Sequence, residues 1–127
     1  MKEYKLLIRN LPGSKEAFSK ERHLEFVQAC ERYIGGLKAA GKLLGAQPLE
    51  REGLMLAGKE GAWTQSPFQE GKDVIVGDYH VLADDLEEAV TIAKGNPEFS
   101  YTDTARVEVR PIKGSERSTG FVYPKAS

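Results

Sequence analysis

One stretch, residues 66–112, limits the fold more than any other, because it reads as a strand, a helix and a second strand in direct succession. Val74 to Leu82 alternates in the manner of a strand, and Asp84 follows as a helix cap, with acidic residues in the first turn. The helix would end at Gly95, and Ala105 to Ile112 would form the closing strand. This order predicts two strands joined by a helix that packs back onto their sheet.

The first part of the chain predicts the same combination. Tyr4 to Arg9 is a short apolar run typical of a buried strand. Lys20 to Ala40 carries apolar residues three or four positions apart, which predicts a helix, and Gly41 is a natural stop for it. The expected buried stripe of this helix is Leu24, Val27, Cys30, Ile34 and Leu37.

Between these halves the sequence predicts further strands. Lys42 to Leu49 reads as a strand, and Leu54–Ala57 with Ala62–Gln65 reads as a hairpin. The fold class is therefore α+β, a ferredoxin-like β-α-β-β-α-β order with an antiparallel sheet and an extra hairpin. Both helices would lie on one face of the sheet. We expect the other face to be apolar and to be buried against a second copy, which predicts a homodimer.

Composition excludes several classes of function. The chain has 127 residues, 18 basic and 19 acidic, with a formal charge of −1, so it lacks the basic field that nucleic-acid binding needs. One cysteine and two histidines are too few for a typical metal site, and no cofactor motif is present. The short apolar run near the start predicts neither a signal peptide nor a membrane span. We expect a soluble cytoplasmic protein without metal or cofactor.

Several phrases in this sequence carry a family resemblance. Pro67-Phe68 is followed by Glu70, Lys72, Gly77 and Tyr79, then by Ala-Asp-Asp-Leu-Glu-Glu-Ala at 83–89 and Val-Glu-Val-Arg-Pro at 107–111. With the opening strand, these phrases resemble the YCII-related family in its DGPF-type branch. The resemblance implies a domain over residues 1–112, followed by a polar tail over residues 113–127. It also implies a dimeric α/β barrel with a cavity between the sheet and the first helix.

The chain departs from this family pattern at two places. Gln65 and Ser66 stand where the branch usually has Asp-Gly, so a carboxylate is missing. Cys30 stands where members usually have a histidine, which with an aspartate is the family's proposed acid–base site. Both departures bear on any proton-transfer mechanism that the resemblance would imply.

Four polar residues are candidates for catalysis. Cys30 is either a thiol facing the cavity or an inert core residue, and His23 lies about 10 Å from it on the same helical face, too far for a direct pair. Asp78 and His80 share one face of a strand about 7 Å apart, close enough to share a ligand. The alternative is that His23 is a surface residue and that Asp78 and His80 form a solvated or interface pair.

Aromatic residues near the motif phrases are candidates for ligand binding. Trp63, Phe68 and Tyr79 would supply a wall for a small molecule, with Ser66 beside them. Core or interface packing is the alternative use of such rings.

Two functions therefore stay open. One is a homodimeric YCII-like protein that binds a small organic molecule in its cavity, with proton-transfer or lyase-type chemistry on a carbonyl or lactone-like substrate implied by the family. The other is a non-enzymatic regulatory or interaction module that contacts another protein through its dimer and tail.

Overall fold

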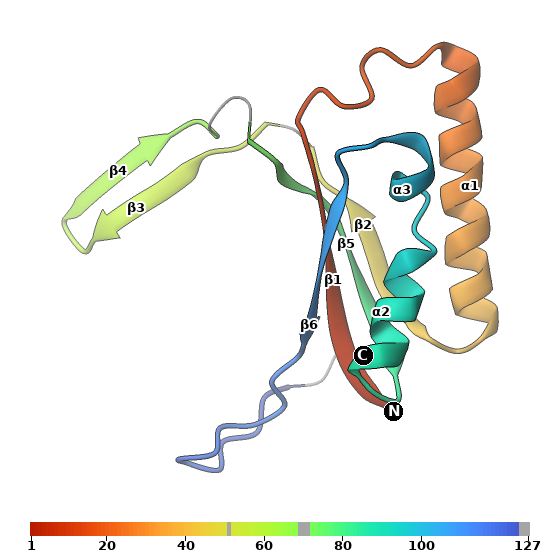
Figure 1. Ribbon diagram of the computed structural model, residues 1–127. Coiled ribbons are helices and arrows are strands. Elements are labelled where there is room, and N and C mark those ends of the chain that lie inside the picture. The colour runs from red at the N-terminus through yellow and green to blue at the C-terminus, as the bar shows by residue number, and fades with distance from the viewer. Residues whose placement is uncertain (51, 69–71, 125–127) are drawn as a thin grey trace.

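The computed structural model describes residues 1–50, 52–68 and 72–124. Within this part, the fold is α+β: a four-stranded antiparallel sheet, a separate two-stranded hairpin and three helices (Figure 1). In chain order the elements are β1 (Lys2–Asn10), α1 (Lys20–Ala39), β2 (Leu43–Pro48), β3 (Met55–Lys59), β4 (Ala62–Ser66), β5 (Val74–Ala83), α2 (Leu86–Lys94), α3 (Glu98–Tyr101) and β6 (Arg106–Pro111).

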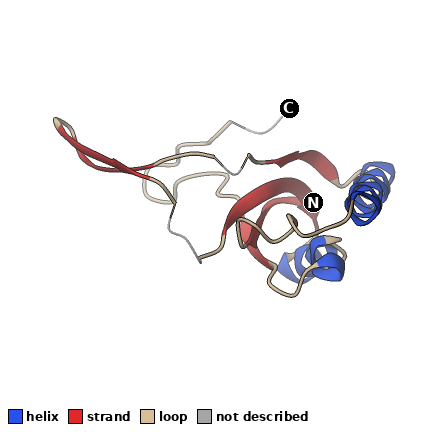
Figure 2. Cartoon of the chain, turned by 90° about the horizontal axis from the view of Figure 1, so that it is seen from above, coloured by secondary structure: helices blue, strands red, loops and turns tan. Residues whose placement is uncertain are grey.

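The sheet has the strand order β2-β5-β1-β6, so the two central strands are β5 and β1. Buried and more exposed residues alternate along β1 and along β5 from Gly77 to Ala83, so one face of each strand is buried there. The helices α1 and α2 lie on that face and leave the other face open (Figure 2). The core joins Tyr4, Leu6 and Ile8 of β1 to Tyr79, Val81 and Ala83 of β5, Leu37 of α1, and Ala89 and Ala93 of α2.

The ends of α1 and α2 follow from local chemistry. Ser19 Oγ accepts a hydrogen bond from the Arg22 amide at 3.1 Å, and Gly41 adopts a φ of 70° just past the helix, as predicted. The cap of α2 is Asp85, one residue later than predicted. Asp85 has extended backbone and accepts from the Glu88 amide at 2.8 Å, while the Glu88 carboxylate accepts from the Asp84 amide at 3.3 Å. This reciprocal pair decides the helix start.

The buried stripe of α1 follows the predicted one at Ile34 and Leu37 and differs from it at the start of the helix. Phe26 and Leu37 are its buried residues, whereas Leu24 is 57% exposed. Phe26 turns inward because it packs edge-to-face on Tyr101 at 5.5 Å and on Phe18 at 6.4 Å. Aromatic contacts from outside the helix therefore set its rotation.

One irregularity changes which side chains of β5 share a face. The register between β1 and β5 shifts after the Ile8–Gly77 pair, so that Arg9 pairs with Ile75. Val76 consequently packs against the core, and Ile75 lies with Arg9 in a separate hollow. Regular alternation would place Ile75 on the same face as Tyr79, so the strand departs from the predicted alternation at this end.

The open face of the sheet is charged rather than apolar, which corrects the expectation that it would be an apolar patch. Its side chains form ion pairs along the strands: Lys5–Asp78 at 3.2 Å, Arg9–Glu108 at 3.1 Å and Arg106–Asp73 at 2.6 Å. Leu7 and Leu82 contribute half-buried apolar surface between them. The alternation predicted by the sequence is correct, but polar groups occupy the outward positions.

Three features lie outside this layered body. The short helix α3 was not predicted, since Pro97 read as the end of a helix. The hairpin of β3 and β4 extends away from the sheet on the side without helices (Figures 1 and 2). Residues 113–124 form a turn closed by a bridge between Ser115 and Val122, with the rings of Phe121 and Tyr123 in contact at 5.1 Å.

Candidate functional site

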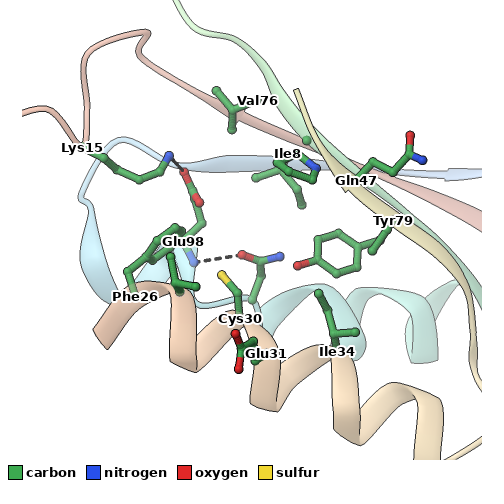
Figure 3. A pocket seen from close by; sticks show the side chains of 15 residues that line it. Ile8, Lys15, Phe26, Cys30, Glu31, Ile34, Gln47, Val76, Tyr79 and Glu98 are labelled. Carbon is green, nitrogen blue, oxygen red and sulfur yellow. Dashed lines mark hydrogen bonds and ion pairs between the residues drawn. The ribbon is translucent and has the colours of Figure 1, made fainter. Parts of the chain in front are cut away.

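A cavity of about 330 Å³ lies between α1 and the sheet. Figure 3 shows Cys30 and Tyr79 pointing into this space, with Lys15 and Glu98 at one end. Most of the wall is apolar, and the side chains of Ile8, Phe26, Val27, Ile34, Ala46 and Val76 provide it. This is the combination typical of small-molecule sites: apolar walls with a few convergent polar groups.

Two phenols stand at the inner wall of the cavity region. Tyr79 is 8% exposed and packs edge-to-face on Tyr33 at 5.4 Å. Burial is the main cause that raises the pKa of Tyr79, to about 12, and it also raises the pKa of Tyr33. The Tyr33 hydroxyl donates to the Ile92 carbonyl at 2.6 Å. Both phenols are therefore neutral at physiological pH, and that of Tyr33 acts as a hydrogen-bond donor.

Cys30 contributes a thiol to the wall of the cavity. Burial raises the pKa of Cys30 above its ordinary value, and the negative charge of Glu98 raises it further, against an opposing effect of Lys15. The thiol therefore stays protonated near neutral pH. Since the thiolate is the nucleophile, the geometry argues against nucleophilic catalysis by Cys30.

An ion pair between the partly buried Lys15 and the buried Glu98 lies at one end of the cavity. Glu98 is 5% exposed, and its Oε1 lies 2.5 Å from the ammonium of Lys15. The Asn10 side chain donates to the same oxygen at 2.9 Å. A carboxylate buried to this degree needs such partners, because an unpaired charge in the interior is very costly.

Asn10 is the centre of the polar network behind Glu98. This fully buried amide donates to Glu98 and to Thr102 Oγ1, each at 2.9 Å. It accepts from the Leu11 amide at 2.9 Å and from Thr104 Oγ1 at 2.6 Å. Both donors and both acceptor positions of the amide are used. The network therefore joins the end of β1 to α3 and to the chain that leads into β6.

An aromatic cluster holds Lys15 in place. The Arg22 guanidinium lies 4.9 Å from the ring centres of both Phe18 and Tyr101, and the Lys15 ammonium lies 5.4 Å from that of Phe26. These contacts fasten the loop between β1 and α1 to α3. The loop thereby delivers Lys15 to the buried end of the cavity.

The structure separates the predicted catalytic residues. Among the four, Cys30 lines the cavity, whereas Asp78 and His80 lie on the open face. Asp78 pairs with Lys5, and His80 Nε2 lies 2.8 Å from a Glu3 carboxylate oxygen. His23 borders a shallow surface hollow near the start of α1.

The predicted ligand-binding residues are also dispersed. Tyr79 lines the cavity, and Ser66 and Phe68 line a second hollow of about 570 Å³ at the base of the hairpin. Trp63 lies farther out on β4 and is 59% exposed. Glu70, one of the residues behind the family resemblance, lies outside the described residues.

Sequence reasoning missed Lys15, Asn96, Glu98 and Asn10, all of which belong to this site or its support. Lys15 and Glu98 are 83 positions apart, so no local spacing indicates their pairing. The signal that was available is Asn96-Pro97-Glu98 directly after a helix. The Asn96 side chain accepts from the Glu98 amide at 2.9 Å, a local turn that an Asn before proline favours.

The sequence of this chain matches the model of one known protein family. The model of the YCII-related domain matches residues 3–113. The chain belongs to the YCII-related family. The match covers every element of this YCII-related fold, from β1 to β6. No curated protein is similar enough to be counted as a relative. In the described part of the chain, no helix has the length and apolar character needed to cross a membrane.

We predict that Asn10→Ala destabilises the YCII-related domain by about 2–4 kcal/mol, because it leaves buried partners of the amide unsatisfied. Thr104→Val removes one of the four hydrogen bonds and should cost about 1 kcal/mol. Urea unfolding followed by circular dichroism measures both. Equal effects of the two variants would contradict the central role of Asn10.

We predict that alkylation of Cys30, the single cysteine, has a pH profile displaced upward from that of the urea-unfolded chain. Glu98→Gln should move the profile down, because it removes a negative charge that raises the pKa, and Lys15→Met should move it up. Iodoacetamide rates measured from neutral to alkaline pH provide the test. A folded profile at or below the unfolded one would refute this environment for the thiol.

Proposed function

We propose that this YCII-related protein is a homodimer that binds a small organic molecule in the cavity between the sheet and α1. The observation that carries the proposal is an apolar cavity of about 330 Å³ that ends at the ion pair of the partly buried Lys15 with the buried Glu98. This volume is at the lower end of the roughly 300–1,000 Å³ found for small-molecule sites. A compact ligand with an apolar body and one polar end fits these walls.

The polar end of the ligand would meet Lys15 and Glu98. The Lys15 ammonium provides a positive donor for a carbonyl oxygen, and Glu98 provides a carboxylate that accepts a proton. If the proton leaves a carbon next to that carbonyl, the negative charge that develops on the oxygen faces the ammonium. This arrangement supports proton-transfer or lyase-type chemistry on a carbonyl or lactone-like compound, with Glu98 as the base.

The neutral groups complete this proposal. The Cys30 thiol remains protonated and supplies polarizable wall rather than a nucleophile. The Tyr79 hydroxyl, whose pKa is raised to about 12, keeps its proton and can donate to a ligand oxygen. His80 and Asp78 have no part in this chemistry, because they lie on the open face of the sheet.

The assembly that we propose is a dimeric α/β barrel made of two ferredoxin-like halves. The strand order β2-β5-β1-β6, with both long helices on one face, supports it. In such a dimer the open faces of two sheets meet. The half-buried Leu7 and Leu82 would become buried there, among ion pairs that are already formed within each chain.

An alternative function rests on the tail. Residues 113–124 present Phe121, Val122 and Tyr123, which are 56%, 69% and 39% exposed. Exposed apolar side chains on a short, internally bonded turn suit a contact with another protein. On this alternative, removal of residues 113–127 should abolish capture of a partner in a pull-down and leave thermal stability unchanged. Identical captured proteins with and without the tail would refute it.

Ligand binding is tested by comparing the wild type with a variant whose cavity is partly filled by a larger side chain. A panel of small carbonyl compounds and lactones should contain one that raises Tm by several degrees and slows alkylation of Cys30 by about tenfold or more. Ala46→Leu places a larger side chain in the cavity wall and should abolish both effects. Ala57→Leu makes the same change on the exposed hairpin and should preserve them.

The role of Glu98 is tested with the compound that binds. Glu98→Gln retains the shape of the side chain but removes the proton acceptor. Exchange of the ligand's acidic C–H protons in D₂O, followed by NMR, should therefore fall at least about tenfold in this variant. If no compound of the panel changes the Tm or the alkylation rate of the wild type, Ala46→Leu or Ala57→Leu proteins, the binding proposal itself is refuted.

A further inference from the structure

The hairpin of β3 and β4, with the residue before it, presents exposed apolar side chains that the proposed ligand site does not use. Leu54, Met55, Leu56 and Trp63 are between 54% and 63% exposed. Every residue of both strands is exposed, so neither face of the hairpin is covered by the rest of the chain. An isolated two-stranded hairpin in water is only marginally stable. Its apolar side chains therefore lack the packing that a stable hairpin normally has.

The face that carries Trp63 is especially bare. Trp63 lies opposite Gly58, and Leu56 lies opposite Gln65 on the same face. A side chain at position 58 would meet the carbonyl oxygen of Ala62 at 2.1 Å, so glycine is required there. The indole ring consequently has no cross-strand neighbour to cover it. Trp63 and Leu56 form a surface ready for an external contact, which we call the arm face.

The base of the hairpin is fixed to the body. Gly53 lies so close to Phe68 that an added Cβ would stand 2.9 Å from the ring. Met55 and Ser66 border the same hollow as Arg9 and Ile75 of the sheet. The hairpin is thus an anchored arm, and it extends on the side of the sheet without helices (Figures 1 and 2).

The charges of the open sheet face indicate which partner the arm meets. Among the described residues, the charged side chains of this face in β1, β5 and β6, together with Asp73, are four acids and four bases. They are Glu3, Asp73, Asp78, Glu108, Lys5, Arg9, Arg106 and Arg110. A face with balanced charge can meet an identical face without net repulsion, whereas a strongly acidic or basic one cannot.

We infer that the arm closes over the second copy of this chain, burying Trp63 and Leu56 against it. The inference rests on the homodimer of the proposed function and assigns that dimer a specific clasp. The arm starts at the end of the sheet and projects past its open face, so a second copy docked on that face lies within its reach. By two-fold symmetry, each copy both gives and receives one arm.

Trp63 is the single tryptophan of the chain, so its fluorescence reports on the arm alone. We expect its emission to shift to shorter wavelength as the protein concentration is raised and monomer converts to dimer. Its quenching by acrylamide should fall about threefold or more over the same series. Sedimentation measured on the same samples gives the mass. Shielding of Trp63 in samples that are still monomeric would assign the arm face to its own chain and overturn the inference.

A matched pair of substitutions tests the contact itself. Leu56→Asp places a charge on the arm face and should raise the dimer dissociation constant at least about tenfold. Leu24→Asp is the control, since Leu24 is 57% exposed against 58% for Leu56 but lies on α1, on the helical side of the sheet. Circular dichroism checks that both variants keep their secondary structure. Equal dimer constants for the two variants would overturn the clasp.

The possible failures are distinguishable. A dimer in which Trp63 stays open to acrylamide overturns the clasp, retains the proposed homodimer and leaves the arm for a different protein. A monomer at all concentrations up to about 100 μM overturns both the dimer and the clasp. Ligand binding in the cavity is measured separately through Cys30, so it can succeed or fail independently of either outcome.

Discussion

A single buried amide organises the functional half of this molecule. Asn10 is fully buried and makes four hydrogen bonds, three of them to side chains that are distant in sequence and one to the amide of Leu11. A buried polar group without partners destabilises a fold, so these bonds dictate how the end of β1, α3 and the approach to β6 come together. The position of Glu98, and with it the polar end of the cavity, is a consequence of satisfying this amide.

The chemistry of the cavity follows from the same need to give buried polar and charged groups a partner. Lys15 and Glu98 neutralise one another at the polar end of the cavity, and Glu31 adds an exposed carboxylate to the lining. The sulfur and the phenol beside them remain neutral because burial disfavours their charged forms. Such a site suits uncharged ligands with one polar group, since a net-charged ligand would upset the internal pairing.

The sequence predicted the framework better than the site, for physical reasons that differ between residues. Alternation in β1 and β5 and the glycine at 41 are local signals, and the strands and the helix end follow them. The Lys15–Glu98 pair depends on a contact across 83 positions, which no local pattern encodes. Asp84 and Asp85 are equally good caps by composition, and only the Glu88 interaction separates them. The polar character of the open face was readable in the sequence, because Lys5, Arg9 and Asp78 stand at outward positions of the alternating strands.

The register shift in β5 allows one strand to line both the cavity under α1 and the hollow under the hairpin. In a regular strand, Val76 and Tyr79 would point to opposite sides, yet both line the same cavity here. The extra residue changes the alternation of the strand, so that Ile75 lines the hollow under the hairpin while Val76 and Tyr79 line the cavity. Deletion of one residue at this register shift would turn the side chains on one side of it to the opposite face of the sheet. The cavity and the hollow under the hairpin, which the native strand separates, would then no longer be distinct.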